Sequence, residues 1–228
     1  MPTPCYLVVE TDRQALSLRR FGFGSSATSQ GGHECPAREP WSKGGGKPGC
    51  NASTETLEIV PFFMYPEGHD LAGCHMRPAE VDHDDPRWPT HCDSCGEPFT
   101  HGELWQENGD VIMRVTAIVP GAAVNVGDEF EFKKMPPGAI WEALWAREWA
   151  KGFDGRAYMC RLPDMHDWQI DSEANNCTRK GDRTHRCWIR EGEAPFLNIS
   201  KNGPTCSAGA GSIQSPNYHG FLQHGVLT

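Results

Sequence analysis

The stretch NNCTRKGDRTHRCW, residues 175–188, brings Cys177, His185 and Cys187 close together in the chain, and Cys206 follows after a short loop. Thiolate and imidazole groups are the ligands that soft divalent metals prefer, and three thiolates with one imidazole complete a tetrahedral site. The spacing predicts a metal centre of Cys177, His185, Cys187 and Cys206 that ties the basic loop to the Asn202-Gly203 turn, with zinc as its occupant. In the alternative interpretation the cysteines are buried thiols and His185 is a hydrogen-bonded loop residue.

A second cluster centres on HCDSCGEPF, residues 91–99, where Cys92 and Cys95 form a CxxC pair followed by glycine. Such a knuckle supplies two ligands, so a closed site needs two more. We expect Cys35 as the third. Histidine and cysteine residues upstream are candidates for the fourth, with His33 or His75 the first choices: His33, Cys50, Cys74 and His75.

A redox role is the competing interpretation of the CxxC pair. That role requires the motif at the start of a helix, where the helix dipole lowers a thiol pKa. Gly96 and Pro98 follow the motif directly, so the sequence favours metal over redox chemistry and predicts two zinc ions per chain.

Sulfur-rich, saturated sites are typical of structural rather than catalytic zinc, because catalytic zinc keeps an open position for water or substrate. The remaining candidate for catalysis is PDMHDWQID, with Asp164, His166, Asp167 and Asp171. The same residues suit a hairpin turn, where proline and aspartate are common. The chain contains no GxSxG, P-loop or HExxH motif. The sequence therefore favours a protein without catalytic activity but leaves the question of an enzyme open.

Composition predicts a loop-rich chain. The 228 residues include ten cysteines, ten histidines, 25 glycines and 18 prolines, and only 38% are hydrophobic. The first residues resemble neither a signal peptide nor a membrane span, so we expect reduced thiols that bind metal, in a cytoplasmic protein without a membrane partner. The net charge of −9 disfavours phosphate binding, although the RKGDRTHRCWIR segment is locally basic.

The fold class that we predict is α+β, with mostly short antiparallel strands, one principal helix, many loops and stabilisation by zinc. Alternating segments such as DVIMRVTAIV predict strands, and residues 158–171 predict a hairpin around a PDMHD turn. PPGAIWEALWAREWAKG, residues 136–152, predicts the helix, because its tryptophans fall four apart. We divide the chain into a loop-rich region with the CxxC knuckle, 1–108, and an α+β domain with the Cys/His site, 109–228.

The segments NCTRKGDRTHRCWIREGEAP, TCSAGAGSI and YHGFLQHG follow one another in the C-terminal half. Together with PPGAIW and WQID they resemble an uncharacterised protein family of tailed bacteriophages and prophages, over roughly residues 136–228. The resemblance implies a viral gene product made in the cytoplasm of a bacterial host, and it implies no particular activity.

Three functions are weighed on this basis. The leading hypothesis is a zinc-stabilised structural or interaction protein of a phage, such as a head or tail accessory component of the virion, whose partners are other phage proteins. The alternative is an early-expressed zinc-ribbon protein that binds nucleic acid or a host protein through the basic loop. The third is a metal-dependent hydrolase.

Overall fold

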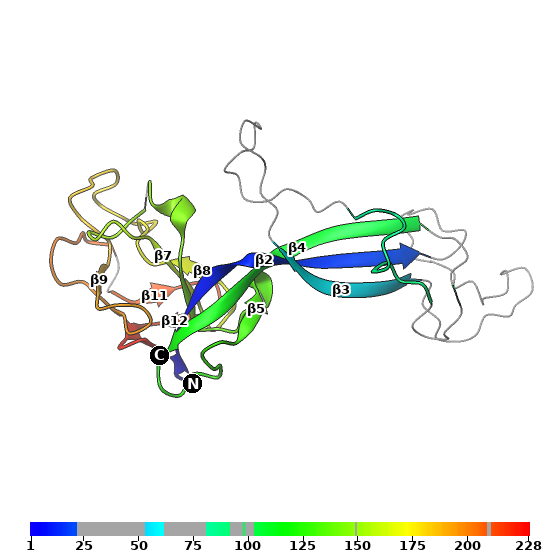
Figure 1. The fold of residues 1–228 in the computed structure, drawn as a ribbon. Coiled ribbons are helices and arrows are strands. Elements are labelled where there is room, and N and C mark those ends of the chain that lie inside the picture. The colour runs from blue at the N-terminus through cyan, green and yellow to red at the C-terminus, as the bar shows by residue number, and fades with distance from the viewer. Residues whose placement is uncertain (22–52, 62–80, 92–97, 99–102, 149, 209–210) are drawn as a thin grey trace, which may run out of the picture. The chain divides into compact units, whose positions relative to one another are not determined.

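The computed structural model describes residues 1–21, 53–61, 81–91, 98, 103–148, 150–208 and 211–228 (Figure 1). The chain divides into two compact units: unit 1 comprises Met1–Thr11 and Ile112–Thr228, and unit 2 comprises Asp12–Val111. The described part consists mostly of strands and loops, as the sequence predicts. Strands β2 (Tyr6–Phe21) and β4 (Glu103–Ile118) contribute residues to both units.

Unit 1 is built on a mixed sheet with the strand order β5-β4-β2-β6-β7-β8. Strand β2 pairs in parallel with β6, while β6, β7 and β8 pair antiparallel. The other strands of this sheet are β5 (Glu129–Glu131), β6 (Ala139–Glu142), β7 (Tyr158–Arg161) and β8 (Asp167–Gln169).

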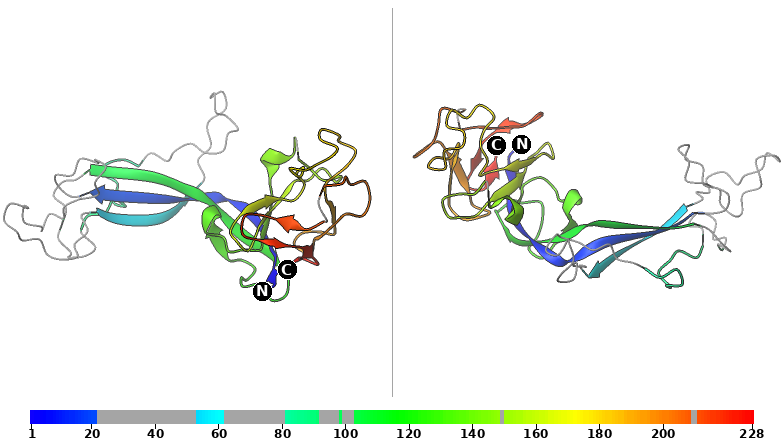
Figure 2. Two further views of the ribbon diagram at one scale, coloured as in Figure 1. Left: turned by 180° about the vertical axis from the view of Figure 1, so that it is seen from behind. Right: turned by 90° about the horizontal axis from the view of Figure 1, so that it is seen from above.

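Shorter strands complete unit 1 and join its ends. The N- and C-termini lie side by side in every view (Figure 2), because Thr3 of β1 pairs with Leu227 of β14. Strands β9 and β10 form an antiparallel pair, as do β11 and β12. The bounds are β1 (Thr3–Pro4), β9 (Ile189–Glu191), β10 (Asn198–Ser200), β11 (Ile213–Gln214), β12 (His219–Gly220), β13 (Leu222–Gln223) and β14 (Val226–Leu227).

The hydrophobic core of unit 1 gathers strand residues from both ends of the chain. Cys5 packs with Ile140 and Cys160 from the mixed sheet, and Leu197, Ile213 and Leu227 approach from the C-terminal part of the chain. Ile199 of β10 belongs to this core, and β10 pairs with β9, which directly follows two of the predicted metal ligands.

The predicted principal helix over residues 136–152 is wrong. The segment forms strand β6, followed by a single 3-10 turn, η3 (Leu144–Ala146). Gly138 precedes the strand with a φ of +94°, and a Cβ on it would lie 2.7 Å from the carbonyl oxygen of Pro4. Ala139, Ile140 and Trp141 are then buried in succession between β2 and β7. Pairing on both sides therefore overrides helix propensity.

The tryptophans of this segment do not share one face. Trp141 is 6% exposed, whereas Trp145 is 53% exposed. Trp149 lies outside the described residues. A spacing of four residues is thus compatible with a strand that ends in a tight turn.

The hairpin predicted over residues 158–171 is confirmed. Strands β7 and β8 pair antiparallel, with Cys160 opposite Trp168. Met165 in the connecting turn has a φ of 66°. A short 3-10 turn, η2 (Phe132–Lys134), precedes β6 and packs Phe132 edge-on against Trp141.

Unit 2 contains an antiparallel pair between β2 and β3 (Ser53–Pro61), which extends from Arg13 opposite Pro61 to Phe21 opposite Ser53. Leu16 and Leu18 of β2 are fully buried and pack with Trp88. Their spacing of two residues is the period of a strand. The segment DRQALSLRRF, residues 12–21, predicts one or two helical turns from its sequence, and this prediction is wrong because the segment belongs to strand β2.

Candidate metal centre

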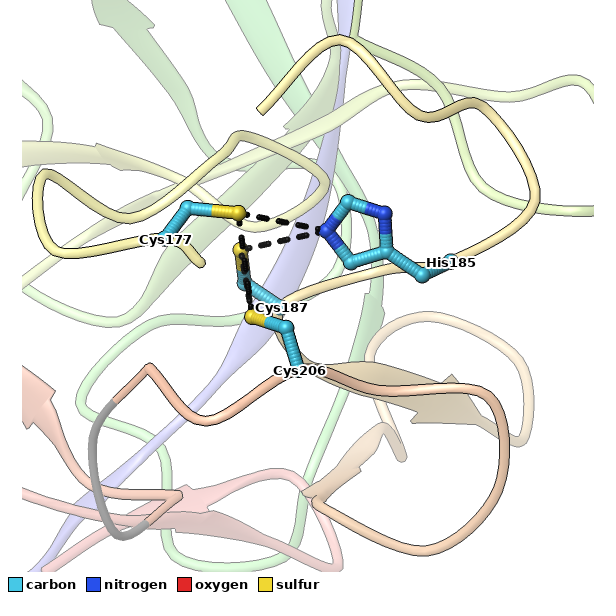
Figure 3. A group of neighbouring side chains, drawn as sticks. All are labelled: Cys177, His185, Cys187 and Cys206. Atoms are coloured by element: carbon cyan, nitrogen blue, oxygen red, sulfur yellow. Dashed lines mark hydrogen bonds between the residues drawn. The ribbon is translucent and has the colours of Figure 1, made fainter. Parts of the chain in front are cut away.

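The Cys177, His185, Cys187 and Cys206 side chains converge from three loop segments of unit 1 (Figure 3). We call these four residues the Cys₃His cluster. Cys177 lies in the long connection after β8, His185 and Cys187 lie directly before β9, and Cys206 follows β10. The antiparallel pairing of β9 with β10, with Ile189 opposite Ser200, brings the last two segments together. The four ligand atoms all lie within 4.8 Å of one another.

The distances within the cluster agree with a tetrahedral ion site. Cys206 Sγ lies 3.7 Å from Cys177 Sγ and 3.6 Å from Cys187 Sγ. His185 Nε2 lies 3.3 Å from Cys177 Sγ and 4.0 Å from Cys187 Sγ. With Zn–S bonds of about 2.3 Å and a Zn–N bond of about 2.0 Å, a tetrahedron places two sulfurs about 3.8 Å apart and sulfur and nitrogen about 3.6 Å apart.

The cysteines of the cluster are free thiols. Their sulfur separations are far longer than a disulfide bond, which is about 2.05 Å. The sulfur atoms therefore have the separation that a shared cation requires.

The orientation of His185 leaves the correct nitrogen available for a metal. Its Nδ1 lies 2.6 Å from the carbonyl oxygen of Asp182. Since a carbonyl can only accept, Nδ1 carries the proton and Nε2 presents its lone pair to the three sulfurs. A hydrogen bond of this kind on the far side of the ring is typical of metal-binding histidines.

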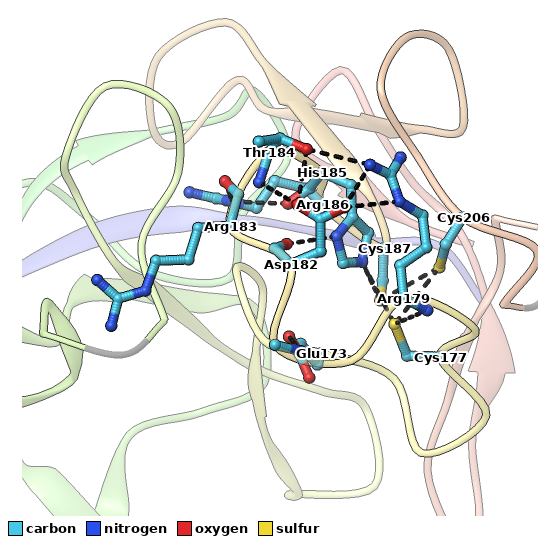
Figure 4. Close-up of polar contacts among 11 residues, drawn as sticks. Glu173, Cys177, Arg179, Asp182, Arg183, Thr184, His185, Arg186, Cys187 and Cys206 are labelled. Atoms are coloured by element: carbon cyan, nitrogen blue, oxygen red, sulfur yellow. Dashed lines mark hydrogen bonds and ion pairs between the residues drawn. The ribbon is translucent and has the colours of Figure 1, made fainter.

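Asp182 in turn is fixed by the loop. Its carboxylate accepts hydrogen bonds from the Thr184 hydroxyl and backbone N–H and an ion pair from Arg179 (Figure 4). These hydrogen bonds, those from Thr184 first, hold the pKa of the Asp182 carboxyl well below its usual range. The Asp-Arg-Thr turn thus positions the carbonyl that orients His185.

Backbone N–H groups point at all three sulfurs. Arg179 N lies 3.3 Å from Cys177 Sγ, and Ala208 N lies 3.4 Å from Cys206 Sγ, in each case two residues beyond the cysteine. Ala174 N lies 3.2 Å from Cys187 Sγ. Such donors stabilise a thiolate more than a neutral thiol. The loops are therefore shaped to hold negative charge on sulfur.

The electrostatics of the thiols differ within the cluster. Burial raises the pKa of the Cys206 thiol, but the Ala208 N–H and the Cys187 and Cys177 thiols outweigh it and lower that pKa to about 6. Burial above all raises the pKa of the Cys187 thiol to about 12. The Cys206 thiol therefore loses its proton more readily than the Cys187 thiol.

The cluster is closed to solvent on most sides. Cys187 is 1% exposed and His185 2% exposed, and Cys177 is also buried, while Cys206 is half-buried. Ala174, Trp188 and Ala208 pack around the sulfurs. With four protein ligands, a tetrahedral ion here has no position left for substrate.

The second predicted zinc site cannot be placed, because its candidate ligands lie outside the described residues: His33, Cys35, Cys92 and Cys95, with Cys50, Cys74 and His75 as alternatives. The sequence prediction of this site stays a prediction.

The acidic and histidine residues of the PDMHDWQID hairpin do not converge on one point. Asp167 pairs with Arg161. Asp164 accepts hydrogen bonds from the Ser215 hydroxyl, at 2.6 Å, and the Asn217 N–H. Asp171 faces Arg190, which also pairs with Asp154. Each carboxylate thus has a structural partner.

Two residues beside the cluster were missed by the sequence analysis. Asp182 sits in a D-x-T turn, a pattern that predicts a carboxylate capping backbone and hydroxyl groups. Lys201 donates to carbonyls of two ligand segments. No local pattern indicates that role, because its acceptors are backbone oxygens from other loops.

Comparison of the chain with known protein families, curated proteins and solved structures finds no match in any of the three. Among the described residues, no helix has the length and apolar character needed to cross a membrane.

Proposed function

We propose that the Cys₃His cluster binds one structural zinc ion and that the chain serves as a zinc-stabilised structural or interaction protein. The observation that carries the proposal is the convergence of three thiols and a correctly oriented imidazole within 4.8 Å. Zinc suits this donor set because sulfur and imidazole ligands in a tetrahedron select it over magnesium or calcium.

The structural role follows from the ligand count and the burial. Three thiolates reduce the Lewis acidity of zinc, and four protein ligands exclude a reactive water. The ion would join loops that have little apolar core of their own, since no described strand lies between β8 and β9. Binding free energy at such a site becomes folding free energy.

The resemblance of residues 136–228 to a tailed-phage family supports a more specific proposal. The chain would be a phage gene product made in the bacterial cytoplasm, where thiols stay reduced, and then a head or tail accessory component of the virion. A structural metal ion that holds the loops together suits a virion protein, because such a protein must stay folded without being replaced. The protein should co-purify with intact particles and stay with them through a density gradient, and its absence from particles would contradict the virion assignment.

The metal assignment is tested by chelation. Protein purified without chelator or metal resin is treated with a strong zinc chelator, and tryptophan signals are followed, since Trp188 packs on the cluster. We expect a change in near-ultraviolet circular dichroism that added zinc reverses. Unchanged spectra with no zinc released would show that the cluster holds no ion.

We keep a second zinc ion, at Cys92, Cys95, Cys35 and His33, as a proposal that rests on sequence alone. A chain with both sites would release two ions to the chelator. Variants of Cys92 and Cys95 should release one.

Nucleic-acid binding is a second candidate, and one observation favours it. The acidic charge belongs to unit 2, which has eight lysines and arginines against sixteen aspartates and glutamates, whereas unit 1 has thirteen against fourteen. The charge of unit 1 therefore does not exclude a contact with phosphates. Arg183 points away from the cluster (Figure 4), and Lys180, in the same loop, is exposed.

Not every basic residue of the loop is available for such a contact. Arg190 is committed to Asp154 and Asp171, and Arg179 to Asp182. The test is therefore a K180A/R183A variant in fluorescence anisotropy with labelled single-stranded DNA and RNA, with Lys133→Ala as the control. Salt-sensitive binding by the wild type and the control, lost in the variant, would support this candidate. No binding by the wild type at low salt would remove it.

A further inference from the structure

Lys201 stands apart from the other described lysines. Lys133, Lys134, Lys151 and Lys180 are exposed, whereas Lys201 is half-buried beside the Cys₃His cluster. Its ammonium donates hydrogen bonds to the carbonyl oxygens of Cys187, at 2.7 Å, and Ala208, at 2.6 Å. One carbonyl belongs to a ligand, and the other belongs to the residue whose N–H points at Cys206. The ammonium thus joins two of the three ligand segments.

The aliphatic part of the Lys201 side chain also has close contacts. Gly211 approaches so closely that a Cβ on it would lie 2.9 Å from Lys201 Cγ, and Gly211 has a φ of +86°. The Thr205 hydroxyl donates to the Lys201 carbonyl at 3.2 Å. These contacts fix the path of the side chain toward the cluster.

The charge of Lys201 has no carboxylate partner within the described residues, where its hydrogen bonds go to carbonyl oxygens. A half-buried ammonium without a counter-ion is costly, because burial removes part of its hydration. Three thiolates around one divalent ion carry a net charge of −1. A metal-loaded Cys₃His cluster is therefore the counter-charge that the position of Lys201 requires.

We propose that Lys201 is a positioning residue of the metal centre, which ties the Cys187 and Cys206 segments together and neutralises the charge of a divalent ion bound by three thiolates. The inference rests on the proposed zinc site. It further specifies the charge state of that site. A divalent ion bound by three deprotonated cysteines has a net charge of −1, which the single positive charge of Lys201 neutralises.

The test compares four forms of the full chain for zinc affinity, measured by competition with a chromophoric chelator: wild type, Lys201→Met, Lys201→Gln and Lys201→Arg. Loss of a residue that supports the metal ligands by hydrogen bonds, without binding the metal itself, typically costs about 10–100-fold in metal affinity. We expect a loss in this range for Lys201→Met and Lys201→Gln, and a smaller loss for Lys201→Arg, which restores the charge. Lys180→Met, at an exposed lysine of the same unit, is the matched control and should bind as the wild type.

Cobalt substitution separates positioning from a general folding defect. Saturated with Co²⁺, the Lys201→Gln variant should show the thiolate-to-cobalt absorption of the wild type, but only at higher metal concentration. Wild-type affinity in both neutral variants would overturn the role of Lys201 and leave the zinc site intact. A wild type that binds neither ion would overturn the site and, with it, this inference.

Discussion

Unit 1 contains two groups of cysteines in contrasting surroundings. Cys5, between β1 and β2, and Cys160, on β7, are fully buried in the apolar core. Contact with the Cys5 thiol, together with burial, holds the pKa of Cys160 well above its usual value. The Cys₃His cluster instead lies on loops, and each of its sulfurs accepts a backbone N–H.

The difference shows that burial alone does not identify a ligand thiol. Cys187 is nearly as buried as Cys160. What distinguishes Cys187 is an imidazole nitrogen, further thiols and an amide donor directed at the same point. The core cysteines act as small apolar side chains, whereas the loop cysteines are arranged for charge.

The comparison predicts its largest effect for Cys187→Ser. A hydroxyl is a poor replacement for a thiolate ligand, so the variant should lose the ion of the Cys₃His cluster. We expect unit 1 to lose more than about 5 kcal/mol of unfolding free energy, because metal binding at a structural site contributes directly to folding. Urea denaturation measures the loss, and equal stability of variant and wild type in the presence of zinc would contradict the proposal.

The next largest loss of unfolding free energy is expected for Arg190→Met, a change that removes a buried ion pair and not a metal ligand. The Arg190 side chain is 7% exposed and faces the Asp171 side chain, 3% exposed, at 3.1 Å. Removing the arginine leaves a buried carboxylate uncompensated, which costs about 3–5 kcal/mol.

Arg114→Met is the matched control for that change. Arg114 pairs with Glu129 at the surface, and such a pair contributes about 1 kcal/mol or less. Denaturation of both variants should therefore separate them clearly. Equal losses would show that the Arg190 pair is no stronger than a surface pair.

A smaller effect is expected for Cys160→Ser. The change places a hydroxyl in an apolar core and should cost about 1–3 kcal/mol in unfolding free energy. Zinc content should stay at the wild-type value, because Cys160 lies in the core and not in the Cys₃His cluster. Loss of zinc from this variant would contradict the division of the cysteines into two groups.

The smallest effect concerns the titration of Asp154. Hydrogen bonds from Arg190 in the first place, against an opposing effect of burial, lower the pKa of its carboxyl below its usual value. Because the folded-state pKa is lower than the unfolded one, Asp154 stabilises the fold above the unfolded pKa, and this contribution disappears as the pH falls through the folded pKa. Carboxyl NMR titration should show the low pKa in the wild type and a higher one in Arg190→Met.

The sequence predicted the Cys₃His cluster because its signal is chemical and mostly local. A histidine between two cysteines in a polar loop indicates a ligand set whatever the surrounding fold. The hairpin over residues 158–171 could also be predicted from the sequence, since alternating apolar residues are followed there by typical turn residues. The role of Lys201 could not be predicted from the sequence, because its partners are backbone carbonyls that only the tertiary structure brings together.

The helix prediction at residues 136–152 was wrong for a physical reason that the sequence hides. Tryptophans four apart match a helix face, but Ala139, Ile140 and Trp141 have strand partners far away in the chain. Pairing between residues that distant outweighs local periodicity. The helical turns expected at residues 12–21 were wrong as well, although Leu16 and Leu18, two residues apart, have the period of the strand that forms there.

Native mass spectrometry of the wild type, Cys187→Ser and Cys160→Ser tests the central claim most directly. We expect Cys187→Ser to carry one zinc ion fewer than the wild type, and Cys160→Ser to carry the same number. A wild type without zinc, or equal zinc in all three proteins, would contradict the assignment of the Cys₃His cluster as a structural zinc centre.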